Sequence, residues 1–331
     1  MKDQRNAGNE PENKMEAGRK QFLVPDFRNS IVNISATLAE FLGAPNRNET
    51  LPILKEELGR GYRTIVFLCF DGLGMYPLRK NLAQTDFLFQ NLRQVLLSTF
   101  PSTTTNATTS LLTNQLPLEH GWFGWSMHFA ALHRNVDIYL GRDSATREAI
   151  SFSDYPLGRA DCYFDHANSD YAVRTVFPPY VSAARQGRNR AFQTAGEFWS
   201  AIEESCRNPG KQFVYAYYPE IDSVMHKYGV SSPEARCAIR EVSCRLKVLH
   251  ESMEDALFIV SADHGQIDVA GYVELYQDET LLEMLEIYPF LEARAPAFLV
   301  KKGREQAFEQ YFQDKYGEDF VLWKSADLVA K

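Results

Sequence analysis

The stretch YRTIVFLCFDGLG, residues 62–74, decides the fold that this sequence predicts. From Thr64 to Phe70 it is a run of β-branched, aliphatic and aromatic residues, with one cysteine. Such a run is typical of a short strand that is buried on both faces, as in a parallel sheet. Asp71 and Gly72 then end the run with residues that favour turns. A strand of this kind needs partner strands and covering helices, and the rest of the chain supplies candidates for both.

Two further apolar runs also lead into acidic and histidine residues. Residues 213–218 form a second predicted strand, and residues 257–261 form a third. Weaker strand candidates are residues 95–100 and 297–300. Helical patterns alternate with these strands, at residues 30–42, 106–113, 194–206, 232–251, 280–286 and 304–315. The alternation predicts an α/β fold with a mainly parallel central sheet flanked by helices.

The predicted domain organisation has three parts. Residues 1–20 are polar throughout, and we expect a disordered N-terminal tail there. Residues 21–331 are predicted to form a single catalytic α/β domain. Within it, residues 122–190 have weak periodicity and are interpreted as an inserted cap. Its aromatic residues either stack on a nucleobase or form the core of the cap itself; they include Trp122, Trp125, Phe129 and Tyr139.

Composition excludes several classes of protein. The formal net charge of −8 argues against a nucleic-acid coat protein. The five cysteines are odd in number and include no CxxC pair, which argues against disulfides and thiolate zinc sites and fits a reducing cytoplasm. No signal-peptide core is present in the first twenty residues, and no stretch approaches the ~18 apolar residues of a membrane span. We expect a soluble cytoplasmic protein with small-molecule partners, and its oligomeric state stays open.

The acidic and histidine residues after the three strands should meet at one edge of the sheet. Ligands of open α/β sheets bind beyond the carboxyl ends of the strands. Each motif alone could be an ordinary turn or a chance pair, but converging carboxylates are costly unless cations neutralise them. Mixed sets of Asp and His suit zinc, manganese or iron. The sequence therefore predicts a metal site made from Asp71, Asp222, His226, Asp263 and His264.

A fourth motif is the hydroxyl-rich stretch FPSTTTNA, residues 100–107. Hydroxyl side chains at the start of a helix usually cap it. Beside a metal site, however, a hydroxyl loses its proton more easily and becomes a nucleophile. The N-terminus of the following helix would also offer backbone N–H groups to a phosphate.

In order and spacing, these motifs resemble the alkaline-phosphatase superfamily, in particular its type I phosphodiesterase/nucleotide pyrophosphatase branch. The resemblance rests on FDGLG (70–74), FPSTT (100–104), SLLT (110–113), PLEHG (117–121), EIDSVMH (220–226) and ADHG (262–265). In that family the nucleophile stands sixteen residues before the His of the Pro-x-x-His-Gly turn, and counting back from His120 gives Thr104. The resemblance implies hydrolysis of a phosphodiester, nucleotide pyrophosphate or phosphomonoester through a phospho-threonine on Thr104.

The same resemblance implies two divalent metal ions, zinc or alternatively manganese, and a set of ligands for each. One metal would be held by Asp71, Thr104, Asp263 and His264. The second would be held by Asp222, His226 and a further His. The resemblance gives His120 a structural role in its turn.

The chain departs from the family pattern at two places. Where family phosphodiesterases often place an Asn that holds a phosphoryl oxygen, this chain has Ala107, which leaves Asn106 as the candidate for substrate binding. No His follows His264, so we expect an incomplete C-terminal lobe and a weak second metal site. The remaining candidates to replace that ligand are His128, His133, His166 and His250. The alternative function is a catalytically impaired relative that binds phosphate ligands without turnover.

Overall fold

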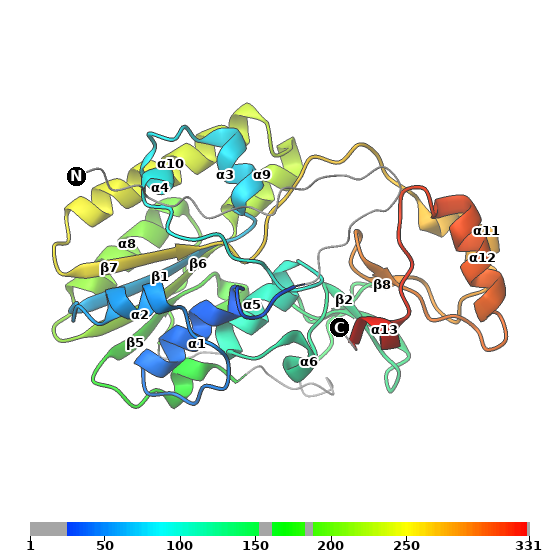
Figure 1. The fold of residues 1–331 in the computed structure, drawn as a ribbon, viewed down its shortest axis with the longest axis horizontal. Helices are drawn as coiled ribbons and strands as arrows, with labels where there is room; N and C mark the ends of the chain where they lie inside the picture. Colours follow the sequence, from blue (N-terminus) through cyan, green and yellow to red (C-terminus); the bar gives the residue numbers. More distant parts are fainter. Residues whose placement is uncertain (1–24, 152–160, 183–187, 330–331) are drawn as a thin grey trace. The chain divides into compact units, whose positions relative to one another are not determined.

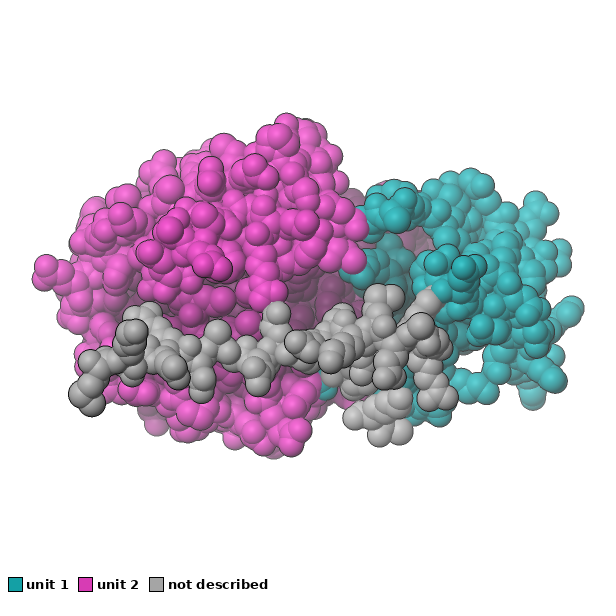
Figure 2. Space-filling model, turned by 45° about the horizontal axis from the view of Figure 1, so that its top comes forward, with its two compact units in different colours: residues 1–25, 269–331 teal, residues 26–268 magenta. Residues whose placement is uncertain are grey.

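The computed structural model describes residues 25–151, 161–182 and 188–329, and it divides into two compact units. Residues 26–268 form the sheet unit, while the other unit comprises residues 1–25 and 269–331 (Figure 2). We call the described residues 269–329 the C-terminal unit. The tail predicted at residues 1–20 lies outside the described residues. The interpretation of residues 21–331 as a single catalytic domain stays a prediction.

The sheet unit is built on a four-stranded parallel sheet with the order β5–β6–β1–β7 (Figure 1). The strands are β1 (Thr64–Phe70), β5 (Ala172–Val176), β6 (Gln212–Tyr218) and β7 (Ala256–Ser261). Every residue of β1 is buried, as is every residue of β6. The prediction of an α/β fold with a parallel sheet is confirmed.

Helices cover both faces of this sheet, because alternate side chains of a strand point to opposite sides. Val66, Leu68 and Phe70 belong to one hydrophobic core, and Ile65, Phe67 and Cys69 belong to the other. The first core is shared with α3 (Met75–Asn81), α8 (Ala195–Arg207), α9 (Glu220–Tyr228) and α10 (Pro233–Glu251). The second is shared with α1 (Val32–Phe41), α2 (Pro52–Leu58) and α5 (Thr104–Thr113). Figure 1 shows these two groups of helices on opposite sides of β1 and β6. Short helices α4 (Phe87–Gln90), α6 (Pro117–His120) and α7 (Pro179–Ser182) lie in the connections.

The predicted strand at residues 95–100 is not formed. The segment makes one isolated parallel bridge, between Ser30 and Leu97, and the Ser98 hydroxyl donates to the backbone carbonyl of Asp263 at 2.6 Å. Pro101 follows, and a proline has no N–H to donate to a strand ladder. An apolar run beside the sheet therefore serves as a connection that leads into α5.

The predicted cap also differs from the structure. Strands β2 (Ser126–Phe129), β3 (Arg134–Asp137) and β4 (Arg142–Asp143) pair antiparallel, and a small hydrophobic core contains Trp122 and Phe129. Yet β5 lies in the same stretch and is the edge strand of the main sheet, and the 3-10 helix η2 (Tyr163–His166) contributes to the second hydrophobic core. The boundary at residue 190 is therefore wrong. The sequence analysis did not identify β5 as a strand of the main sheet, because its sequence AVRTV is short and partly polar.

The C-terminal unit has its own hydrophobic core, shared by α11 (Glu279–Glu283) and α12 (Glu305–Tyr316). It also contains the 3-10 helix η3 (Leu275–Gln277), the antiparallel pair β8 (Phe290–Leu291) and β9 (Pro296–Ala297), and α13 (Ser325–Val329). The strand expected at residues 297–300 is reduced to this pair and a bridge between Leu285 and Val300. None of the helices in the described part of the chain combines the length and the apolar character that a bilayer crossing needs.

Candidate metal centre

The carboxyl ends of the central strands bring the predicted site together. In the register of the sheet, Phe70 of β1 lies beside Tyr218 of β6, and Cys69 lies beside Ser261 of β7. Because all three strands are parallel, the residues that follow them leave the sheet at one edge. Asp71 follows β1, Asp222 lies in the first turn of α9 after β6, and Asp263 and His264 follow β7.

Two glycines allow the connections at this edge to approach closely. Gly72 has a positive φ of 70°, and a Cβ atom there would lie 2.8 Å from Oδ1 of Asp222. A Cβ atom on Gly74 would lie 2.7 Å from the Cα atom of Gly265. Any larger residue at either position would push the carboxylate or the His264 connection outward, since real Cβ contacts are not that short.

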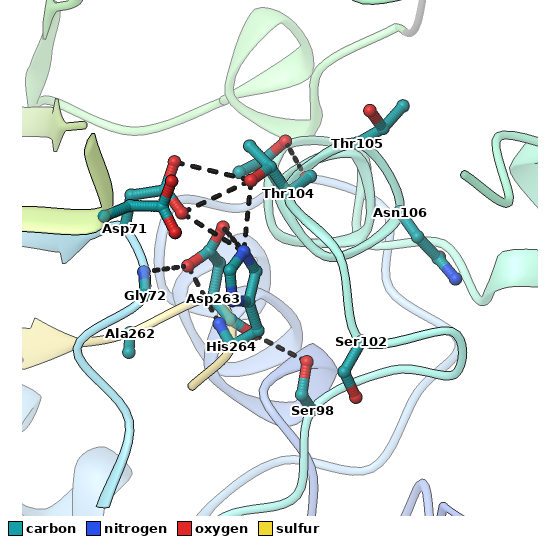
Figure 3. Close-up of polar contacts among 12 residues, drawn as sticks. Asp71, Gly72, Ser98, Ser102, Thr104, Thr105, Asn106, Ala262, Asp263 and His264 are labelled. Carbon is teal, nitrogen blue, oxygen red and sulfur yellow. Dashed lines mark hydrogen bonds and ion pairs between the residues drawn. The ribbon is translucent and has the colours of Figure 1, made fainter. Parts of the chain in front are cut away.

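Asp71, Asp222 and His264 form the centre of the cluster. Each offers one ligand atom, and these atoms lie within 4.8 Å of one another. Nε2 of His264 is 3.2 Å from Oδ1 of Asp71 and 3.7 Å from Oδ2 of Asp263 (Figure 3). Oδ1 of Asp263 accepts hydrogen bonds from the backbone N–H groups of Gly72, at 3.1 Å, and His264, at 2.8 Å.

Thr104, the first residue of α5, points its hydroxyl into this cluster. Its Oγ1 lies 3.3 and 3.4 Å from the two carboxylate oxygens of Asp71 and 3.1 Å from Nε2 of His264 (Figure 3). The hydroxyl of Thr105 is buried, with no hydrogen-bond partner in the described part of the chain, and Figure 3 shows it turned away from Asp71. Geometry therefore distinguishes Thr104 from its neighbour.

His226 and Gln266 approach Asp222 from the other side. Nε2 of His226 is 3.4 Å from Oδ2 of Asp222, and the His226 side chain is 73% exposed. Nε2 of Gln266 contacts Oδ1 of Asp222 and lies 3.3 Å from the Asp222 backbone carbonyl. The sequence analysis missed Gln266, although its place two residues after His264 could have suggested it.

Tyr217 is a second residue that sequence reasoning missed. Its hydroxyl donates a hydrogen bond to Oδ2 of Asp71 from the neighbouring strand β6. Burial, reinforced by the negative charge of Asp71, holds the pKa of Tyr217 well above its usual range, so the hydroxyl keeps its proton. Tyr217 lies beside Cys69 in the register of β6 and β1, so both side chains point to the same face of the sheet. On that face the Tyr217 hydroxyl reaches Asp71.

The structure does not bring Asn106 to the cluster. Asn106 is fully buried, and its Nδ2 donates to the backbone carbonyl of Pro101 at 3.1 Å. In Figure 3 its side chain points away from Asp71 and His264. Neighbouring residues of a helix are rotated by about 100° from each other. Asn106 therefore does not lie on the face of position 107, where family phosphodiesterases often place the Asn that holds a phosphoryl oxygen. Asn106 thus ties the first turn of α5 to the connection before it, at Pro101.

Apart from His133, the other histidines contact residues outside the cluster. His120 is buried, Trp122 donates its backbone N–H to Nδ1 at 3.0 Å, and Nε2 lies 2.9 Å from the Ser110 hydroxyl. Burial lowers the pKa of His120 to about 4, so the ring is neutral and supports the turn after α5. Three of the four replacement candidates also have neighbours of their own. His128 contacts Asn135, His166 pairs with Asp161, and the His250 ring lies 5.7 Å from that of Phe87. His133 lies in a turn after β2, with a positive φ of 49°.

Electrostatics show that the cluster needs positive charge. Burial and the neighbouring Asp71 raise the pKa of Asp263, and burial also raises the pKa of Asp222. Burial alone would lower the pKa of His264, but Asp263 and Asp71 outweigh it and raise that pKa, so a proton is held on the ring. Oδ2 of Asp263 is buried with no hydrogen-bond partner in the described residues. A bound cation would satisfy this oxygen and replace the proton on His264.

The orientation of His264 also fits a metal ligand. Its Nδ1 lies 3.1 Å from the backbone carbonyl of Gly265, which can accept the Nδ1–H group. Such a hydrogen bond fixes the tautomer that leaves Nε2 free to bind a metal. Nε2 is the atom that faces Asp71 and Thr104. Carboxylate oxygens combined with an imidazole nitrogen form a donor set that suits zinc or manganese.

Comparisons with known proteins agree with this fold. The family model of type I phosphodiesterase/nucleotide pyrophosphatase matches residues 65–324. A solved structure of murine ectonucleotide pyrophosphatase/phosphodiesterase 5 is 17% identical, with a TM-score of 0.52, and the match covers 76% of this chain and 69% of that one. An inactive form of the same murine protein, in complex with AMP, is 16% identical with a TM-score of 0.51, and 77% and 70% are covered. At this identity the two structures show a shared fold.

A third solved structure is phosphonoacetate hydrolase from Sinorhizobium meliloti 1021 in complex with phosphonoformate. It is 18% identical with a TM-score of 0.43, and the match covers 66% of this chain and 62% of that one. No curated protein sequence matches the chain.

Proposed function

This chain belongs to the type I phosphodiesterase/nucleotide pyrophosphatase family, a family of metal-dependent phosphoric ester hydrolases, and from that membership we propose that it hydrolyses its substrate through the hydroxyl of Thr104. One observation carries the proposal: Oγ1 of Thr104 lies within hydrogen-bonding distance of both Asp71 and His264. The position at the start of α5 adds backbone N–H groups and the positive end of the helix dipole, which favour a phosphate.

The proposed reaction has two steps. Thr104 Oγ1 attacks phosphorus in line, the bond from phosphorus to the leaving oxygen breaks, and Asp71, at 3.3 Å, is placed to receive the Thr104 proton. Water then attacks the phospho-threonine, which releases the phosphate product and returns the hydroxyl of Thr104. Divalent cations, when bound, stabilise the charge on the attacking and leaving oxygens. Asp71, Thr104, Asp263 and His264 would hold one cation.

A row of aromatic side chains leads away from the proposed nucleophile and supports a nucleotide-like substrate. The rings of Trp125 and Tyr139 lie 6.2 Å apart, and those of Tyr139 and Tyr180 lie 6.0 Å apart. The Tyr139 side chain is hydrogen-bonded to that of Thr108, which lies one helical turn after Thr104. The Tyr180 side chain is hydrogen-bonded to that of Tyr217. Trp122 and Phe129 instead belong to the core of the β2–β3 hairpin. We propose a phosphodiester or pyrophosphate that carries a planar base, and the murine structure with AMP supports this substrate class.

Substitution of Thr104 tests the covalent step. Thr104→Ala should lower hydrolysis of bis(p-nitrophenyl) phosphate by about a thousandfold or more, because loss of a nucleophile leaves only binding and electrostatic assistance. Thr104→Ser should keep measurable turnover, because a hydroxyl remains. Thr105→Ala is the matched control and should stay close to the wild-type rate, since its hydroxyl is turned away from Asp71. Acid quenching followed by mass spectrometry should find phosphate on Thr104.

Two results would count against this mechanism. A fully active Thr104→Ala enzyme would exclude Thr104 as the nucleophile. A wild-type chain that binds metal and AMP but shows no turnover of any phosphate ester would favour the alternative, a relative that binds phosphate ligands without hydrolysis. Metal analysis of the purified chain tests the proposed zinc against manganese. Fractionation of native cells tests the proposed cytoplasmic location.

A further inference from the structure

The second metal of the proposed enzyme has two expected protein ligands, Asp222 and His226. A catalytic metal normally takes three protein ligands and keeps one position open for water or substrate. The structure offers a third donor at the same carboxylate, because the side chain of Gln266 contacts Oδ1 of Asp222 while His226 approaches Oδ2. The inference that follows rests on the proposed metal-dependent function.

Distances around Asp222 suit a shared cation. Donor atoms around one small divalent cation lie roughly 3 Å from each other, because each bond to the metal is about 2.1 Å long. Nε2 of His226 is 3.4 Å from Oδ2 of Asp222, and the carboxamide of Gln266 is in direct contact with Oδ1. His226 and Gln266 therefore each lie as close to the Asp222 carboxylate as neighbouring ligands of one metal do.

The carboxamide of Gln266 can offer oxygen as well as nitrogen. Its two ends differ by a rotation of the terminal group, and the choice between them follows the hydrogen bonds that are present. Without a cation, Nε2 faces the carboxylate and the backbone carbonyl of Asp222, both of which accept hydrogen bonds. A cation next to Asp222 reverses this preference, since it attracts the carbonyl oxygen and repels the N–H groups.

We propose that Gln266 is the third protein ligand of the second metal, bound through Oε1 beside Asp222 and His226. Gln266 is partly buried, and it lies two residues after His264 in the connection that follows β7. One connection thus supplies a ligand to each metal. A neutral amide oxygen binds zinc less tightly than an imidazole does, so the site should discriminate less strongly for zinc over manganese than a site with two His ligands.

The competing interpretation is that Gln266 only donates a hydrogen bond to Asp222. The variant Gln266→Glu separates the two. If the side chain binds the metal, a charged oxygen replaces a neutral one and the second metal binds more tightly. If it only donates a hydrogen bond, glutamate cannot donate and its charge opposes the Asp222 carboxylate, so Asp222 is held less well.

The test is metal titration of the full chain after removal of bound metal, with zinc or manganese alone and with elemental analysis after equilibrium dialysis. We expect two metals per wild-type chain, at least tenfold weaker binding of the second in Gln266→Ala, and tenfold tighter binding in Gln266→Glu. Gln266→His should raise the ratio of zinc to manganese affinity. Ile267→Glu is the charge control: it adds a carboxylate at the next, exposed residue and should change the affinity less than threefold.

Cobalt absorption spectra provide a second readout. With cobalt in the second site, Gln266→Glu and Gln266→His should each shift the visible bands, because the ligand set changes. Unchanged spectra, weaker binding in Gln266→Glu, or equal tightening in Ile267→Glu would each overturn the assignment of Gln266 as a ligand. So would wild-type stoichiometry and affinity in Gln266→Ala. These binding results are independent of hydrolysis, so failure of the Thr104 mechanism is recognised separately by an active Thr104→Ala enzyme.

Discussion

At the scale of single residues, Tyr217 shows how a strand residue can act on the site. The Tyr217 hydroxyl bonds to Oδ2 of Asp71, while Thr104 and His264 approach the same carboxylate. The carboxylate is therefore held from the β6 side while its remaining lone pairs stay available. Groups that orient a metal ligand in this way commonly contribute 10- to 100-fold to metal affinity or activity. Tyr217 is thus a positioning residue.

Removal of this hydroxyl gives the first prediction at this scale. Tyr217→Phe should lower kcat about 10- to 100-fold and weaken metal binding, because Asp71 loses the hydrogen bond that orients it. Steady-state kinetics and metal titration measure both effects. Tyr163→Phe is the control, since the Tyr163 hydroxyl is buried and has no hydrogen-bond partner among the described residues. Equal kinetics for the two variants would remove Tyr217 from the site.

At the scale of helices and strands, Asp278 links α11 and α12 of the C-terminal unit. Its carboxylate accepts from the backbone N–H of Leu281 at 3.2 Å, which caps α11. It also accepts from the α12 residues Tyr311, at 2.7 Å, and Tyr316, at 2.5 Å, and pairs with Lys315 at 3.0 Å. Burial alone would raise the pKa of Asp278, but these partners outweigh it and lower the pKa to about 2.

This lowered pKa predicts how the C-terminal unit responds to acid. The folded unit favours the charged carboxylate, so the stabilisation is complete above the ordinary pKa of 3.8 and is lost as the pH falls through about 2. The shift corresponds to about 2 kcal/mol. Asp278→Asn should therefore speed hydrogen exchange in peptides covering residues 279–316 at pH 7, and the difference from wild type should disappear near pH 2.

Asp314→Asn is the matched control for the acid response. Asp314 is exposed on α12, and Gln310 donates to its Oδ1 at 2.8 Å. Its replacement should leave hydrogen exchange in the same peptides unchanged at both pH values, because surface contacts of this kind contribute little. An Asp278→Asn chain that exchanged like wild type at pH 7 would show that the carboxylate does not stabilise the two helices.

At the scale of the whole molecule, all the proposed metal ligands lie in the sheet unit, residues 26–268. Metal at 100 times its dissociation constant should stabilise that unit by about 2.7 kcal/mol, because only the folded state holds the ligands together. Hydrogen exchange should slow in peptides covering residues 64–74, 212–228 and 256–266 and stay unchanged at residues 305–316. Addition of EDTA should reverse the effect. Equal protection of both units would show that the bound metal does not act on the sheet unit alone.

The fold class and most of the proposed ligands could be predicted from the sequence because they depend on local patterns. The apolar run at residues 64–70 is typical of a buried strand, and parallel strands deliver the residues that follow them to one edge. Asp71, Asp222 and His264 lie together in the structure. The choice of Thr104 among three adjacent threonines came from the resemblance to the family, through its spacing from His120, and its hydroxyl faces Asp71 in the structure.

Only the tertiary structure decided the contacts of residues that no local sequence pattern marks as part of the site. Tyr217 looks like any other aromatic residue of a buried strand, and it meets Asp71 across 146 positions of the chain. Gln266 reaches Asp222 across 44 positions, and Asn106 turned out to support Pro101 rather than a substrate. Hydrophobic patterning indicates which residues are buried and in what element, because hydrophobicity is a property of each side chain. The packing of strands and helices selects the partner of each polar group, because that depends on all the elements together.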